Sequence, residues 1–337
     1  MKKSSLLLIL FTILIIVSFS SLTLGKYPVP VSDILQFFFN NYFNIGSMDS
    51  EKAKLLENLI MEIRLPRIFA ALMIGASLSV SGATFQAIFV NPLVSPSLLG
   101  VLAGASFGAA LGMVVAKSWY VVQAFSFVFG FIAVAISVVI AKIHKGNSIL
   151  LLILGGIISG AFFTSMLSII KYIADPYNQL PAITQWLMGG LSFSDKQTVL
   201  ITAFPQAVGI ILIIFFSGYI NALSMGDDEA RSLGVPVEKI RLLLVFLSTL
   251  ISCVTVVIGG IIGWVGLIIP HICRMIAGPD NKILIPASAL IGAAYLVLVD
   301  DISRLLFSVE IPIGITTSII GIPFFVFILK QSRRGWN

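Results

Sequence analysis

About ten long apolar stretches alternate with polar connectors along this chain of 337 residues. A helix needs about 20 apolar residues to cross the hydrocarbon core of a bilayer, and most of the stretches approach or exceed that length. They cover residues 5–25, 68–90, 98–116, 120–141, 148–170, 197–218, 241–259, 264–277, 283–303 and 313–330. Only helices and closed barrels can satisfy their backbone hydrogen bonds within lipid. The pattern therefore predicts an all-α, polytopic membrane protein.

The composition agrees with this prediction. Hydrophobic residues make up 58% of the chain and charged residues only 11%, and the mean hydropathy is +1.06, well outside the range of soluble proteins. No polar segment is long enough to fold alone, so residues 1–337 are predicted to form a single transmembrane domain. Small residues at helical spacing, such as Gly75, Ser79 and Gly82, favour close helix packing; lining a pathway is the alternative.

The ends of the chain suggest an orientation. Lys2 and Lys3 precede the first apolar stretch as in a signal peptide, but no small-residue cleavage site follows, so we expect an uncleaved span with a cytoplasmic N-terminus. An even number of spans then places both termini in the cytoplasm, and a slight excess of Lys and Arg on that side agrees. Residues 26–63, with a short helix over 52–63, and residues 171–196 would lie outside.

One hydrophilic segment, residues 221–241, interrupts the apolar pattern more strongly than the other connectors. It contains an acidic cluster, then Leu233 and Gly234, then Pro236 and a basic end. Gly commonly ends a helix and Pro commonly begins one, so the segment predicts a short helix that stops at Gly234 and restarts after Pro236. From spacing alone it could be a docking surface for a soluble partner or an ordinary solvated loop.

Several common motifs are absent from the sequence. It has no GxxxxGK[ST] phosphate loop and no HExxH, GxSxG or CxxC motif, so the chain is not expected to hydrolyse ATP or to be an enzyme. His271 and Cys273 are close in sequence but do not make a metal site. The net charge of +6 comes from residues near helix ends, which argues against nucleic-acid binding.

A series of sequence blocks occurs in a fixed order along nearly the whole chain. The blocks are residues 64–67 (RLPR), 75–86 (GASLSVSGATFQ), 91–96 (NPLVSP), 259–274 (GGIIGWVGLIIPHICR), 300–304 (DDISR), 310–314 (EIPIG) and 321–323 (GIP). Taken together they resemble the FecCD/BtuC-type permease subunits of type II ABC importers. Trp264 stands where the family has Phe, a conservative aromatic exchange.

The resemblance implies a BtuC-like fold with ten helices and a homodimer with the pathway at its interface. It also implies two copies of a separate ABC ATPase, which would use ATP and Mg²⁺, and a substrate-binding protein on the outer face. No cofactor or metal is expected on this chain, and the location implied is the inner membrane of a prokaryote. The segment 221–241 would be the coupling helices that contact the ATPase, with these contact residues: Glu229, Ala230, Arg231, Leu233 and Gly234.

The resemblance also suggests residues for docking and gating. Arg64, Arg67 and Arg304 match positions that pair with glutamates of the binding protein; interfacial snorkelling of long side chains is the alternative. The cytoplasmic gate would include Asn91, Leu93, Asn147 and Ser148, although Asn-Pro at a helix end is also simply a favourable turn.

The function implied is therefore that of a permease for a metal chelate (an iron–siderophore, haem or cobalamin) or a metal oxyanion (molybdate or tungstate). A stand-alone secondary transporter or channel is the alternative. The scarcity of acidic residues within the apolar stretches counts against ion coupling.

Overall fold

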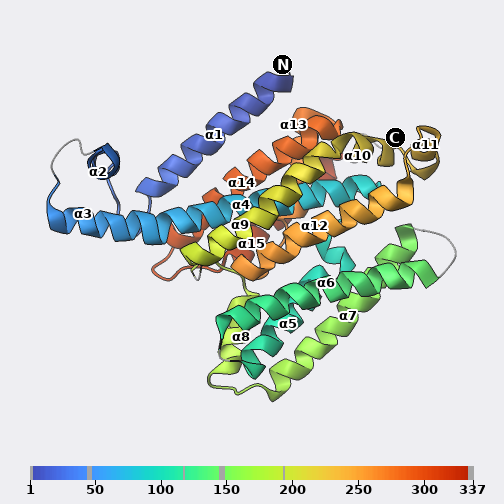
Figure 1. Ribbon diagram of the computed structural model, residues 1–337, viewed down its shortest axis with the longest axis horizontal. Helices are drawn as coiled ribbons and strands as arrows, with labels where there is room; N and C mark the ends of the chain where they lie inside the picture. Colours follow the sequence, from blue (N-terminus) through green and yellow to red (C-terminus); the bar gives the residue numbers. More distant parts are fainter. Residues whose placement is uncertain (1–2, 44–47, 117, 144–148, 193, 333–337) are drawn as a thin grey trace.

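The computed structural model describes residues 3–43, 48–116, 118–143, 149–192 and 194–332. Every regular element in these residues is a helix (Figure 1). Ten helices correspond to the predicted spans: α1 (Lys3–Thr23), α4 (Leu65–Ile88), α5 (Val101–Val115), α6 (Trp119–Ile143), α7 (Ile149–Ile173), α9 (Lys196–Phe215), α12 (Val237–Gly259), α13 (Val265–Ala277), α14 (Asn281–Leu305) and α15 (Ile313–Ser332). By length and composition, 7 helical runs could cross a membrane alone, and α5, α13 and α15 are shorter apolar helices. The all-α prediction is confirmed.

Shorter helices occupy the connectors. They are α2 (Val31–Phe43), α3 (Ser50–Glu57), the π-helix η1 (Asn58–Arg64), the 3₁₀-helix η2 (Pro96–Leu99), α8 (Gln179–Leu187), α10 (Ser217–Leu223) and α11 (Asp227–Ser232). The sequence predicted a helix over 52–63; in the structure α3, η1 and α4 form one continuous run of 39 residues (Figure 1). Pro66 cannot donate an N–H to the preceding turn, and the π-helical turn falls just before it.

Helix α4 lies at the centre of the bundle, where α9, α12, α13 and α14 contact it. Two contacts are so close that only glycine fits. A Cβ atom on Gly75 would lie 2.2 Å from the carbonyl oxygen of Gly292, and one on Gly82 would lie 1.9 Å from that of Gly266. The packing role predicted for the small residues is therefore seen at Gly75 and Gly82.

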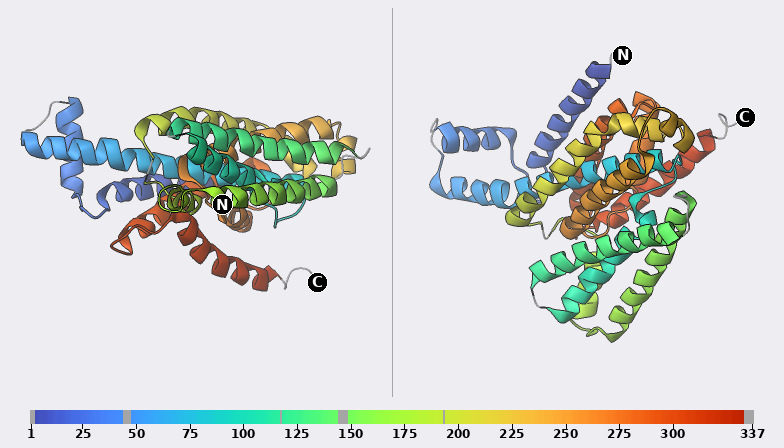
Figure 2. Two further views of the ribbon diagram at one scale, coloured as in Figure 1. Left: turned by 90° about the horizontal axis from the view of Figure 1, so that it is seen from below. Right: turned by 45° about the vertical axis from the view of Figure 1, so that its right-hand side comes forward.

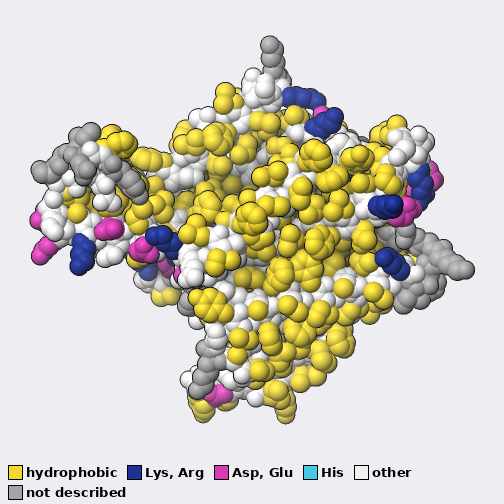
Figure 3. Space-filling model, viewed as in Figure 1, with side chains coloured by type: hydrophobic (Ala, Val, Ile, Leu, Met, Phe, Trp, Pro, Cys, Tyr) yellow, Lys and Arg dark blue, Asp and Glu magenta, His cyan; other side chains and the backbone are white. Residues whose placement is uncertain are grey.

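The remaining helices surround this centre unevenly. Helices α5, α6, α7 and α8 form a second group beside it, while α15 diverges from the bundle (Figures 1 and 2). Hydrophobic side chains cover the middle of the visible face, and charged side chains gather mostly toward the ends of its long axis (Figure 3). We call these the α2 end and the α11 end, after the short helices that lie there (Figure 1).

Candidate functional site

The predicted break in the hydrophilic segment is present. Helix α11 is followed by Gly234, whose φ is +78°, and α12 begins after Pro236. The N–H of Gly234 donates to the carbonyl of Arg231 at 2.9 Å, and that of Val235 donates to Ala230 at 3.1 Å. These bonds close the last turn of α11 in the manner of a Schellman motif. The chain therefore reverses direction in a rigid turn.

The five predicted contact residues differ in exposure. Leu233 is 63% exposed, and Glu229, Arg231 and Gly234 are also at the surface. Ala230 is 0% exposed and belongs to the main hydrophobic cluster. Ala230 therefore anchors α11 to the bundle instead of contacting a partner, which differs from the expectation, because α11 turns that side toward the core.

Ion pairs fasten α11 to the start of α12. Arg231 contacts Glu238 at 2.8 Å and Asp228 at 3.3 Å, and Arg241 pairs with Asp227. The hydrogen bond with Glu238 is the main cause that raises the pKa of Arg231 above its ordinary value. Because the pairs of Arg231 with Glu238 and of Arg241 with Asp227 cross the Gly-Pro turn, α11 and the first turns of α12 are linked as one unit.

The predicted gate residues that the structure describes lie in a tight turn after α4, residues 90–94, which we call the gate turn. The side-chain oxygen of Asn91 accepts from the N–H of Leu93 at 2.9 Å, and the N–H of Asn91 donates to the carbonyl of Gln86 at 3.1 Å. Val90 has a φ of +48°, and Leu93 is 53% exposed. The other two predicted gate residues, Asn147 and Ser148, lie outside the described residues.

The three arginines predicted to face a binding protein are buried in this chain. Arg64, Arg67 and Arg304 are 3%, 9% and 8% exposed. The guanidinium group of Arg64 donates to the carbonyls of Leu22 and Tyr27, which ties the end of α1 to η1. The side chains turn inward, so they do not snorkel, and docking through them stays a prediction.

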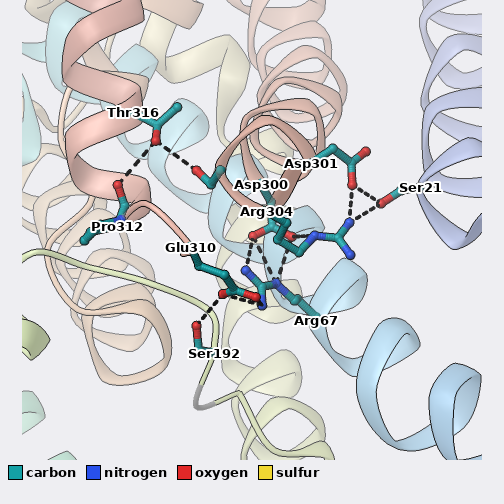
Figure 4. Close-up of polar contacts among 10 residues, drawn as sticks. Ser21, Arg67, Ser192, Asp300, Asp301, Arg304, Glu310, Pro312 and Thr316 are labelled. Carbon is teal, nitrogen blue, oxygen red and sulfur yellow. Dashed lines mark hydrogen bonds and ion pairs between the residues drawn. The ribbon is translucent and has the colours of Figure 1, made fainter. Parts of the chain in front are cut away.

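Arg67 and Arg304 belong to a network with acidic residues that the sequence analysis had left unassigned (Figure 4). Arg67 donates to Asp300 at 2.9 Å and to Glu310 at 3.0 Å. Arg304 pairs with Asp300 at 3.2 Å and with Asp301. We call these five residues the arginine network. The spacing of Asp300 and Asp301 four and three residues before Arg304 is typical of paired charges on one helix and was the available signal.

The arginine network reaches two further segments. Ser21 of α1 donates to Asp301 at 2.7 Å, and Ser192 of the α8–α9 connection donates to Glu310 at 2.8 Å (Figure 4). Partial burial acts to raise the pKa of Glu310, but Arg67 and Ser192 lower it more, so the net pKa is below its usual value. The network thus joins α1, α4, α14, the α8–α9 connection and the α14–α15 connection at the α2 end.

No group of three or more His, Cys, Asp or Glu residues in the described part of the chain is placed to hold a metal ion. A large open cavity of about 710 Å³ lies elsewhere, between the end of α8, the α12–α13 turn and α15. It is lined mainly by apolar side chains, among them Met188, Trp264 and Ile319. Such a surface can contact lipid, a second chain or a passing solute.

Comparison with known proteins decides the family. Residues 13–331 match the model of the FecCD transport family. The chain belongs to the FecCD transport family. It is a multi-pass membrane permease of the ABC-importer type. Membership of this family implies an ATPase partner and a substrate-binding protein.

Relatives span almost the whole chain. The molybdate import system permease MolB of Haemophilus influenzae is 37% identical over 96% of this chain and 95% of its own length. The vitamin B12 import system permease BtuC of Citrobacter koseri is 38% identical over 82% of this chain and 84% of its own. A solved inward-facing structure, described as a metal-chelate type ABC transporter, is 35% identical with a TM-score of 0.87, covering 97% of this chain and 99% of that one.

Proposed function

We propose that this FecCD-family chain is the permease subunit that forms the translocation pathway for a metal chelate or a metal oxyanion. The named relatives import molybdate and vitamin B12, which supports both substrate classes. The α11 turn is the observation on which the proposal rests. It presents Leu233 and charged side chains to solvent on a unit that is fastened to α12, as a contact for a separate ATPase requires.

We further propose a homodimer with two ATPase copies, in the inner membrane of a prokaryote. The open apolar cavity beside α15 supports a pathway between two copies, because a second chain would close it. Lys3 bonds to Asp280, and Asp280 to Asn221 of α10, so α1 begins close to α10. Helix α15 also runs toward the α11 end (Figure 2), which supports two cytoplasmic termini at that end.

The binding protein would then dock at the α2 end, on the surface that the arginine network holds together. A carboxylate of the binding protein could contact Arg67 only by replacing one of its present partners, since breaking a buried ion pair without replacement is costly. Glu310 is the more accessible partner, with a side chain that is 35% exposed against 2% for Asp300. ATP and Mg²⁺ would be used by the ATPase, and this chain would bind no cofactor.

Reconstitution tests the proposal. The chain is assembled in vesicles with its ATPase and binding protein, and uptake of iron–siderophore, haem, cobalamin and molybdate is measured. We expect uptake of one substrate class that requires ATP and both partners. Uptake by the chain alone, driven by an ion gradient, would instead establish a secondary transporter.

A further inference from the structure

Gln86 lies at the junction of α4, α13 and the gate turn, and it is 3% exposed. Its side-chain nitrogen donates to the carbonyl of Leu267 at 3.2 Å, and its side-chain oxygen accepts from Nη2 of Arg274 at 2.6 Å. Its backbone carbonyl accepts from Asn91 of the gate turn at 3.1 Å. One residue therefore connects the gate turn to two positions on α13.

Arg274 is an unexpected residue to find in this contact. It is partly buried, and no carboxylate in the described residues forms an ion pair with it. A cation that leaves water without a counter-ion pays a desolvation cost that an apolar side chain would avoid. A short hydrogen bond from a charged donor is, however, stronger and more directional than one between neutral groups. The Arg274–Gln86 bond is therefore better suited to fixing a position than to adding stability.

The end of α13 that carries Arg274 is also close in sequence to a contact with α10. Only Gly278 and Pro279 separate α13 from Asp280, whose side chain accepts from Asn221 of α10 at 2.8 Å. The side-chain oxygen of Asn221 accepts in return from the N–H of Asn281 at 2.7 Å. Three residues separate the end of α10 from the start of α11. A movement of α11 with α10 would thus reach the α13–α14 connection through two hydrogen bonds and, across Gly278 and Pro279, the end of α13.

We propose that Gln86 and Arg274 are positioning residues that transmit the movement of α11, through α13, to the gate turn. The proposal rests on the proposed function, since it assigns a mechanism to the same coupling segment and gate. The gate turn has a conformation that can relax, because Val90, a β-branched residue, holds a left-handed φ of +48° that costs free energy. Loss of the Arg274–Gln86 bond would leave only the Gln86–Leu267 bond between that turn and α13 through this side chain.

The first test separates transport from hydrolysis in the reconstituted transporter. Gln86→Leu and Arg274→Met each remove the bond while largely keeping side-chain volume. We expect each variant to lower uptake about tenfold while ATP hydrolysis stays within about twofold of wild type. The double variant should fall no further than Gln86→Leu alone, because that variant already removes the Arg274–Gln86 contact. Multiplying effects, unchanged uptake, or a parallel fall of uptake and hydrolysis would overturn the proposal.

Ser81→Ala provides a matched control. Ser81 also lies on α4, and its hydroxyl shares a buried hydrogen bond of 2.8 Å with Ser252 of α12, without contacting α13 through that bond. We expect this variant to keep uptake and hydrolysis coupled. If Ser81→Ala uncouples them as strongly as Gln86→Leu, any weakening of α4 packing is sufficient, and the assigned role is wrong.

A second measurement needs no transport and so distinguishes a failure of this proposal from a failure of the proposed function. Val94, 2% exposed in the gate turn, is replaced by Cys after Cys253 and Cys273 are replaced by Ala in the full chain. We expect Gln86→Leu and Arg274→Met to increase thiol labelling of position 94 about tenfold, without further increase in combination. Equal labelling with and without the bond contradicts the proposal, whether or not wild-type uptake requires ATP.

Discussion

Arginine–carboxylate ion pairs occur at both ends of the molecule, but they are exposed at one end and buried at the other. At the α11 end, the side chain of Arg231 is 49% exposed and pairs with Glu238, which is 46% exposed. At the α2 end, the side chain of Arg67 is 10% exposed and pairs with that of Asp300, which is 2% exposed. Water screens the first pair and not the second, so the first can exchange partners at little cost while the second holds its helices in place.

Removal of Asp300 should have the largest effect. Asp300→Asn leaves Arg67 and Arg304 with a weaker partner in a buried site, and we expect the free energy of unfolding to fall by about 3 to 5 kcal/mol. Denaturant unfolding of the purified chain in detergent micelles measures it. The control is Glu62→Gln, which breaks an exposed pair with Lys196 and should cost less than about 1 kcal/mol. Similar losses would abolish the contrast between buried and exposed pairs.

A change at the α11 turn should weaken binding of the ATPase and leave folding intact. Leu233→Asp places a charge on an exposed apolar side chain, and we expect the ATPase to bind at least about 2 kcal/mol more weakly, as for a central interface residue. Affinity of the detergent-solubilised chain for the ATPase is the measurement. Tyr177→Asp, at an 87% exposed residue on the α7–α8 connection, should leave that affinity unchanged. Equal weakening in both variants would contradict a contact at α11.

Gly234 tests the rigidity of the same turn. Its φ is +78°, and a Cβ atom there would meet nothing within 4 Å, so Gly234→Ala changes only the conformational preference. We expect a loss of about 1 kcal/mol in unfolding free energy. Gly218→Ala within α10, where φ is not positive, should be neutral or slightly stabilising. A neutral Gly234→Ala would show that the turn relaxes without cost.

The smallest effect should come from Asp280. Hydrogen bonds from Lys3 and Asn221 lower its pKa from 3.8 to about 2. A lowered pKa adds stability at pH values above 3.8, and this contribution is lost as the pH falls through about 2. Asp280→Asn keeps a capping side chain for α14, so the stability difference from wild type should shrink over that window. A stability difference that does not change with pH would show that the charge of Asp280 does not stabilise the fold.

Local patterns predicted much of the architecture and the coupling turn. Apolar length predicted the spans because a helix in lipid must satisfy its backbone within itself. The Gly-Pro spacing predicted the end of α11 because Gly234 adopts a φ that other residues avoid. Helix α2 and the continuous run through η1 were not predicted. Both depend on packing between segments that apolar length alone does not describe.

The candidate sites divide in the same way. The sequence singled out three arginines at helix ends, Arg64, Arg67 and Arg304. It did not predict that they are buried or which residues they contact. Asp300 and Arg304 lie on one helix, so their spacing could have predicted that they pair. Arg67 and Glu310 are 243 residues apart, so spacing does not predict their contact. Gln86 and Arg274 are 188 residues apart, and neither residue type indicates the other.

The sequence by itself determined that this chain is a helical membrane permease of the FecCD type with a polar coupling segment. Those properties follow from apolar length, glycine and proline placement, and ordered motifs, all of which are local along the chain. Only the tertiary structure decided which side of α11 faces solvent, which carboxylates neutralise the buried arginines, and how α13 contacts the gate turn. Each of these depends on helices approaching closely enough for specific side chains to meet, as at Gly82 and Gly266, and spacing along the chain does not specify that approach.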